Sequence, residues 1–225
     1  MSKMTKSLVA ASVLAATTLA SGTAMADFSG NVGVTSDYIW RGETQASDES
    51  AVSGGLDYSH ESGIYVGTWA SSLGGSSEYE LDIYGGFAFD VGPVSLDIGA
   101  INYGYPKDGN TSDTTEGYIG VSYGMFSAKY SATDDYFDSG DSASYLEAAI
   151  DYPIKDDLTL GLHVGNKFGD YFDNKTSNDG SYSDYSISLS KGDFTFAYSN
   201  TDNDKANGQT DNARIAVSWS HSVDF

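Results

Sequence analysis

The sequence predicts an all-β protein, an antiparallel transmembrane β-barrel of about twelve strands, an even number, with both termini periplasmic. Three observations predict this fold. After residue 26, hydrophobic and polar residues alternate with a period of two along almost the whole chain, which indicates strands with two different faces. Short and long connections alternate between those strands. The last strand is amphipathic and ends on an aromatic residue, Phe225.

The first 26 residues have the three parts of a secretory signal peptide. A basic start is followed by an uncharged apolar run over Leu8–Ala20, and an Ala-Met-Ala cleavage signature ends at Ala26. The apolar run is too short for a spanning helix, which needs about 20 apolar residues. We therefore expect a signal peptide over 1–26, and one outer-membrane β-barrel domain over 27–225.

Composition excludes several function classes. The chain has 11 Lys and Arg against 32 Asp and Glu, a net charge of −21. Such acidity argues against nucleic acid as a partner, because phosphates need a basic surface. The absence of cysteine excludes disulfides, thiol catalysis and zinc sites of the cysteine type. The 17 Tyr, 10 Phe and 3 Trp oppose a disordered chain, which would be poor in aromatics.

Alternation is clearest in the last segment, where Ile215, Val217 and Trp219 take turns with small or polar residues. The same pattern predicts the other eleven strands, over 28–40, 51–60, 63–73, 79–90, 94–100, 119–123, 126–131, 146–152, 158–165, 185–190 and 194–199. In the segment 63–73 the pattern does not say which face is apolar.

The connections favour a transmembrane barrel over a soluble sandwich. Short links lie near 60–63, 90–93, 124–125, 153–157 and 191–193. Long polar links lie over 41–50, 106–113, 133–142, 166–181 and 200–211, and 74–77 is a shorter exception. Short periplasmic turns and longer extracellular loops produce this pattern. A soluble barrel such as a lipocalin stays open as an alternative, because alternation alone does not say which face is wet.

Aromatic residues gather near the predicted strand ends, as the two interfacial belts of a membrane barrel require. Near the loop ends we expect Trp40, Trp69, Tyr103, Tyr105, Phe168 and Tyr198. Near the turn ends we expect Tyr58, Tyr65, Tyr123, Phe126, Tyr152 and Phe225.

Several motifs occur in a fixed order along the first half of the chain. They are Ser-Asp-Tyr-Ile-Trp-Arg-Gly at 36–42, Gly-Leu-Asp-Tyr at 55–58, and the segments 63–69, 79–86 and 102–106. Together with the block 117–135 they resemble the proteobacterial TorF family of porin-like proteins, also labelled Gcw_chp. The resemblance implies a porin in the outer membrane of a Gram-negative bacterium. In bacterial barrels, an aromatic C-terminus such as Phe225 resembles the signal read by the barrel-assembly machinery.

On the barrel model the polar face lines the lumen. The candidate pore-lining residues are Asp37, Arg41, Asp57, Glu80, Asp82, Asp97, Glu116, Lys129, Glu147, Asp151 and Arg214. Rings of carboxylates favour cations in a pore. We therefore expect passive diffusion of small hydrophilic solutes, with cations preferred. The alternative is a narrow or plugged barrel that does not conduct and has a structural, adhesive or ligand-binding role.

Two of these positions have alternative interpretations. Glu80 and Asp82 share one face of one strand, and paired carboxylates can perform acid–base chemistry or bind a metal. In a charged lumen we expect them instead to form hydrogen bonds to Arg, Tyr or water. Arg41, where the first strand meets the first loop, could hold a constriction. It could also pair with Asp37 or reach lipid head groups.

Nothing in the sequence predicts an enzyme. Known outer-membrane hydrolases need a histidine base, and of the three histidines His163 alone points inward, with no serine nucleophile motif beside it. We therefore expect no catalytic residue, no metal ligand and no cofactor. The expected partners are outer-membrane lipids, lipopolysaccharide and small solutes.

Overall fold

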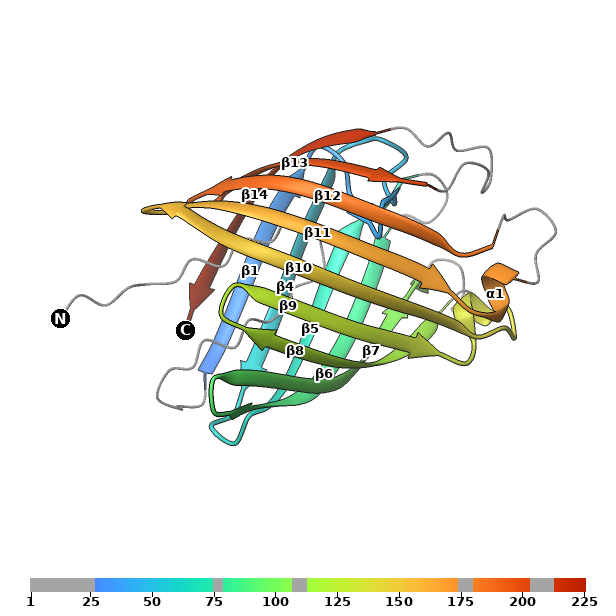
Figure 1. The fold of residues 1–225 in the computed structure, drawn as a ribbon, viewed down its shortest axis with the longest axis horizontal. Helices are drawn as coiled ribbons and strands as arrows, with labels where there is room; N and C mark the ends of the chain where they lie inside the picture. The colour runs from blue at the N-terminus through green and yellow to red at the C-terminus, as the bar shows by residue number, and fades with distance from the viewer. Residues whose placement is uncertain (1–26, 75–78, 107–112, 174–179, 203–212) are drawn as a thin grey trace.

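A computed structural model describes residues 27–74, 79–106, 113–173, 180–202 and 213–225. The predicted signal peptide lies outside these described residues. Within them, twelve antiparallel strands form one closed barrel (Figure 1), so the predicted fold class is confirmed. No helix in the described part of the chain is long and apolar enough to cross a membrane.

The elements follow one another as the alternation predicts. The barrel strands are β1 (Asp27–Thr35), β4 (Ala51–Ser59), β5 (Ile64–Ser72), β6 (Tyr79–Val91), β7 (Val94–Gly104), β8 (Thr114–Tyr123), β9 (Phe126–Thr133), β10 (Ala143–Lys155), β11 (Leu158–Phe168), β12 (Tyr182–Lys191), β13 (Phe194–Thr201) and β14 (Arg214–Asp224). Strands β2 (Ile39–Trp40) and β3 (Glu43–Thr44) pair with each other in a separate hairpin. A 3-10 helix, η2 (Tyr136–Asp138), and one helical turn, α1 (Asp170–Asp173), lie in two of the longer connections.

The first strand closes the barrel. Val32 in β1 lies opposite Gly54 in β4 on one side and His221 in β14 on the other. Each barrel strand therefore has two hydrogen-bonded neighbours, and the barrel itself has no unpaired edge. Closure matters in a bilayer because backbone groups there find no water, and each unpaired group costs several kcal/mol.

Tight turns join the strands at one end of the barrel, the turn end, and longer connections join them at the other, the loop end. Gly92, Gly124 and Gly192 take positive φ in the turns, where glycine is favoured because it has no Cβ. Asp27 pairs with Ser59 and the last strand ends opposite β1, so both described termini lie at the turn end. The predicted alternation of short and long links is confirmed, whereas the compartment of each end stays a prediction.

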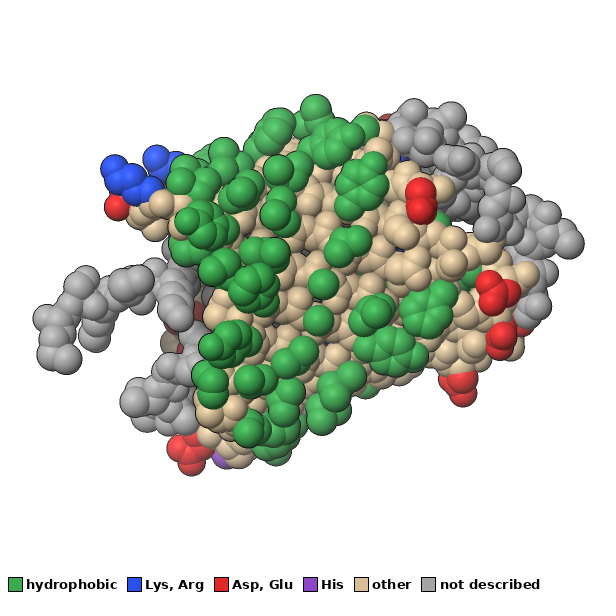
Figure 2. Space-filling model, in the orientation of Figure 1, with side chains coloured by type: hydrophobic (Ala, Val, Ile, Leu, Met, Phe, Trp, Pro, Cys, Tyr) green, Lys and Arg blue, Asp and Glu red, His purple; other side chains and the backbone are tan. Residues whose placement is uncertain are grey.

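The outward face of the barrel is apolar. Its large hydrophobic side chains are exposed, including Val52, Ile83, Ile119 and Ile215. On the face drawn in Figure 2, hydrophobic side chains cover the middle and charged side chains lie toward the two ends. Buried polar and charged groups point inward. A soluble barrel has the opposite arrangement, with apolar residues inside.

The predicted aromatic belts are correct at the turn end except for Tyr65, and partly wrong at the loop end. Tyr58, Tyr123, Phe126, Tyr152 and Phe225 are exposed on the outside, as expected.

Trp40 and Tyr103, however, are 7% and 3% exposed and lie inside the barrel, as do Trp69, Tyr105 and Tyr65. Alternation places a residue near a strand end but cannot say that a loop will cover it. For Trp40 the cause is an early strand end, since β1 stops at Thr35 and not at residue 40. The Thr35 hydroxyl donates to the backbone carbonyl of Asp37, and this local turn directs the chain inward.

Candidate functional site: the lumen and its hairpin

The connection between β1 and β4, residues 36–50, folds into the loop end of the barrel, and we call it the lumen hairpin. Its tip is the turn Arg41–Gly42, with φ of 49° and 82°, and positive φ at both positions is what a two-residue type I′ turn requires. A Cβ on Gly42 would come within 2.6 Å of the Asp184 side chain, so glycine is needed there. Arginine is disfavoured at positive φ, which indicates that contacts of its side chain hold Arg41 in place.

Arg41 binds the barrel wall through Glu116 of β8. Its two terminal nitrogens donate to the two carboxylate oxygens at 2.7 and 2.5 Å. The guanidinium also lies over the rings of Trp40 and Tyr145, at 4.3 and 4.2 Å. Burial acts to lower the pKa of Arg41, but the charge and hydrogen bonds of Glu116, together with the neighbouring Tyr103 and Tyr136, raise that pKa above its ordinary value. Of the alternatives that the sequence left open for Arg41, pairing with Asp37 and contact with lipid head groups are therefore wrong.

Glu43 attaches the next residue of the hairpin to β11 and β12. Its carboxylate accepts hydrogen bonds from the Lys167 ammonium at 3.1 Å and from the Tyr182 hydroxyl at 2.6 Å. The Lys167 side chain is 2% exposed, and its ammonium lies 4.4 Å from the centre of the Trp40 ring. A buried ammonium is tolerated where a carboxylate and aromatic faces replace water.

The base of the hairpin is held near β14. The Thr44 hydroxyl donates to Asp37 at 2.6 Å, and Arg214 lies 3.7 Å from Asp37 and 3.0 Å from Asp48. Burial raises the pKa of Asp37, and the hydrogen bond from Thr44 opposes this shift. The hairpin thus contacts the wall on several sides, at β8, β11, β12 and β14.

A further contact reaches β6. The Tyr38 hydroxyl donates to Glu80 at 2.7 Å, and the Tyr105 hydroxyl donates to the other oxygen of the same carboxylate at 2.6 Å. Burial raises the pKa of Tyr38, and the neighbouring Glu80 charge raises it further. Glu80 therefore forms the hydrogen bonds to tyrosine that the sequence predicts. The side chain of Asp82, two residues along, forms no hydrogen bond with any described residue.

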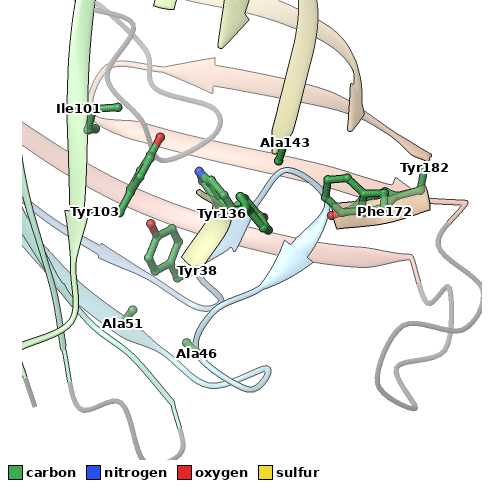
Figure 3. Close-up of a cluster of buried hydrophobic side chains, with 10 residues drawn as sticks. Tyr38, Ala46, Ala51, Ile101, Tyr103, Tyr136, Ala143, Phe172 and Tyr182 are labelled. Carbon is green, nitrogen blue, oxygen red and sulfur yellow. The ribbon is translucent and has the colours of Figure 1, made fainter. Parts of the chain in front are cut away.

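Aromatic residues from two other connections pack against the hairpin. Phe137 of η2 contacts Trp40, and Tyr136 contacts both Phe137 and Phe172 of α1. Figure 3 shows Tyr38 and Tyr103 near Tyr136, with Phe172 beside Tyr182. The loop half of the lumen, from these aromatics down to Glu116, is therefore narrowed by buried side chains.

The turn half of the lumen, which holds Asp57, Asp97, Lys129 and Glu147, has a different character. Lys129 and Glu147 form an ion pair at 3.0 Å, with side chains 29% and 23% exposed. His163 lies between Asp184 at 3.1 Å and Glu147 at 3.8 Å.

Tyrosines in this half hydrogen-bond to carboxylates of other strands. Tyr65 donates to Asp97 and contacts the Tyr118 hydroxyl, and Tyr84 donates to Asp57. Tyr65, Tyr84 and Tyr118 each lie over a glycine of the adjacent strand, and Tyr145 does the same over Gly165.

The structure divides the predicted pore-lining residues between the two halves. Those of the loop half are Asp37, Arg41, Glu80, Asp82, Glu116 and Arg214; those of the turn half are Asp57, Asp97, Lys129, Glu147 and Asp151. Whether solutes pass them stays a prediction.

Sequence reasoning missed Glu43, Tyr145, Lys167, Tyr182 and Asp184 as lumen residues. Lys167 and Asp184 could have been found, because each lies two residues beyond a stretch assigned to the polar face. Nothing in the local sequence marks Glu43, whose role depends on where the hairpin folds.

The fold resembles those of solved porins. The NanC porin is 12% identical, with a TM-score of 0.55 over 87% of this chain and 98% of that one. The KdgM porin is 11% identical, with a TM-score of 0.55 over 88% of this chain and 99% of that one. At such identities the likeness concerns the fold alone. No curated protein matches the chain.

A family model matches residues 19–223, nearly the whole chain, and its description is "Bacterial protein of unknown function (Gcw_chp)". The narrower TorF assignment stays a prediction. Because this model covers nearly the whole chain, the protein belongs to the Gcw_chp family.

Proposed function

We propose that this protein is a porin-like channel of the bacterial outer membrane, through which small hydrophilic solutes diffuse passively along a lumen narrowed by the lumen hairpin. One observation carries the proposal: the closed barrel is apolar outside and lined with charged residues inside. An apolar outer face suits lipid, and a charged inner face suits water and ions.

A preference for cations follows from the charges of the turn half. Asp57, Asp97, Glu147 and Asp151 face a lumen to which Lys129 contributes a positive charge. Lys129 is already paired with Glu147, so the remaining carboxylates give this half a negative potential. Negative side chains raise the local concentration of cations and lower that of anions.

The second candidate is a plugged barrel, which does not conduct and has a structural, adhesive or ligand-binding role. The lumen hairpin favours this candidate. Arg41 is buried together with Glu116, and Lys167 is buried although its partner Glu43 is 25% exposed. Such pairs resist separation, because each charge left alone in a dry site is costly. If the hairpin never leaves, the space that remains decides whether ions pass.

Planar-bilayer recording on the refolded mature chain distinguishes these candidates. We expect small conductance steps, and under a potassium chloride gradient a reversal potential of the sign for cation selectivity. The absence of conductance across many insertions would favour the plugged barrel. Anion selectivity would refute the role that we propose for the carboxylates. A variant lacking residues 38–47 is the control for insertion: it should conduct more than the full chain in either case.

We also propose that the turn end faces the periplasm and the loop end the outside, with lipids and lipopolysaccharide around the barrel. Phe225, which packs on Phe28 at the turn end, is the proposed contact for the assembly machinery. The chain has no cysteine, so single cysteines report location cleanly. An impermeant maleimide should label Asp141→Cys in whole cells and Asp156→Cys only in broken cells. The reverse pattern would overturn the orientation.

We propose no catalytic role for His163. It bonds with Asp184 and Tyr145, and no described serine hydroxyl bonds to it, so the proton relay of a serine hydrolase is not assembled. Lipase and protease assays on the refolded protein should therefore give no signal above a His163→Gln control, and a difference between the two would restore the enzyme hypothesis.

A further inference from the structure

Two carboxylates of β6 are buried side by side beneath the lumen hairpin. Glu80 is 2% exposed and Asp82 is 1% exposed. Both side chains point to the interior. In the pairing with β5, Glu80 lies opposite Ser71 and Asp82 lies opposite Trp69. On the other side, Asp82 is opposite Tyr103 of β7. The surroundings of Asp82 are thus largely aromatic, and supply little to replace the water that an ionised carboxylate has lost.

The two carboxylates differ in their partners. Glu80 accepts one hydrogen bond on each oxygen, from Tyr38 and from Tyr105. Neither oxygen of Asp82 accepts a hydrogen bond from any described residue. A buried charge without a partner is one of the most destabilising features in a protein, so its persistence calls for a compensating group.

No basic side chain supplies the compensation within the described residues. Arg41 is bound bidentately to Glu116, and Lys167 is bound to Glu43. Arg214 lies against Asp37 and Asp48. Each of these three cations is therefore engaged with another carboxylate. Glu80 is left with hydroxyl donors alone, and the Asp82 carboxylate with no donor among the described residues.

We propose that Asp82 and Glu80 bind a hard, oxygen-preferring metal cation, of the class of Ca²⁺ or Na⁺. Asp82 offers two carboxylate oxygens that accept no hydrogen bond. The Tyr38 and Tyr105 hydroxyls are hydrogen-bonded to the neighbouring Glu80 carboxylate. No three acidic or histidine side chains of the described chain converge on a metal position. Water must then complete the coordination shell, as is common for such ions.

A cation at this position also affects the lumen hairpin. Tyr38 belongs to the hairpin and Glu80 to the wall, so an ion that binds Glu80 fixes the wall end of their hydrogen bond. The site thereby stabilises the hairpin where Arg41 and Glu43 do not reach. This inference does not depend on whether the barrel conducts.

Terbium luminescence on the refolded, metal-stripped mature chain tests the site. Tb³⁺ replaces Ca²⁺ at oxygen sites and is excited by nearby aromatic rings, and Asp82 lies across from Trp69 and Tyr103. We expect one class of tight, sensitised binding that Ca²⁺ competes away. In Asp82→Asn that class should weaken by roughly tenfold or more, because site affinity depends on the number of charged ligands. Asp151→Asn, a lumen carboxylate of the turn half, should behave as the parent.

Thermal unfolding separates the two ions and does not depend on a variant. Adding Ca²⁺ should raise the midpoint of the parent if the ion is divalent. Replacing choline chloride by sodium chloride at the same ionic strength should raise it if the ion is monovalent. Equal Tb³⁺ binding by the parent and Asp82→Asn would overturn the proposal. So would a parent midpoint that responds to neither ion, which is the result expected if Asp82 holds a proton.

Discussion

The two halves of the lumen use the same inward-facing positions in opposite ways. In the loop half, Arg41 and Lys167 are buried and join the lumen hairpin to the wall. In the turn half, the Lys129–Glu147 pair remains partly exposed and joins one wall strand to its neighbour. The difference teaches that charge on the inner face of a barrel has two separate uses. Buried pairs position a segment of chain, and in the proposed channel the partly exposed pairs contribute to the potential that a solute would meet.

Removing the Arg41 side chain should have the largest effect. Arg41→Ala leaves Glu116 buried without its partner, and breaking a buried pair in this way costs about 3–5 kcal/mol. Lys129→Ala is the matched change in the turn half, where the pair is partly exposed and about 1 kcal/mol or less is expected. Urea unfolding in detergent measures both. Conductance should rise in Arg41→Ala alone, and equal losses of stability would show that the halves do not differ.

Coupling energies should separate the two halves next. A double-mutant cycle of Glu43→Gln with Lys167→Met should give a coupling of about 2 kcal/mol, within the range for contacting residues. The same cycle for Glu147→Gln with Lys129→Met should give about 0.5 kcal/mol, because solvent screens the pair. A larger value in the turn half would reverse the comparison.

A glycine substitution should test the packing that supports the hairpin. A Cβ at Gly165 would collide with the Tyr145 ring, which stacks on Arg41. Overpacking of this kind costs about 1–3 kcal/mol. Gly117→Ala is the control, since nothing lies within 4 Å of the position of its added Cβ. We expect a lower unfolding midpoint for Gly165→Ala and an unchanged one for the control. If Gly165→Ala unfolds like the parent, Tyr145 is not needed to hold Arg41.

The smallest effect should come from neutralising the turn half. Asp57→Asn with Asp97→Asn removes two lumen charges whose tyrosine partners can still donate to an amide oxygen. The reversal potential should move toward zero while stability changes little, because lumen charge tunes selectivity. Asp193→Asn, in a turn outside the lumen, should leave selectivity unchanged. If the reversal potential of the double variant equals that of the parent, ion discrimination belongs to the loop half.

The barrel could be predicted from the sequence because its cause is local. Each strand must present an apolar face to lipid and a polar face inward, so Ile215, Val217 and Trp219 already reveal the wall to which they belong. Link lengths then place the turns. The lumen hairpin could not be predicted in this way. Trp40 continues the alternation of the first strand, and its burial depends on contacts with η2 and β7 that no local pattern contains.

The site was predictable to the same extent as its strands. Glu80, Glu116 and Lys129 follow the period of two and were found on that ground. Glu43 was not found, because its partners lie 124 and 139 residues further along the chain. The identity of each ion pair likewise depends on closure: Arg41 has acidic neighbours in sequence, yet it binds Glu116, which is 75 residues away.

These long separations have a consequence for the order of folding. Contacts between distant residues form slowly, because the chain between them must first lose its freedom. The walls that hold Glu116, Lys167 and Arg214 exist together only after β14 has paired with β1. The hairpin, although it is among the first segments to be synthesised, is therefore expected to dock last. During refolding, Trp40 should become protected from quenchers after Trp219, because the barrel closes before the lumen hairpin docks inside it.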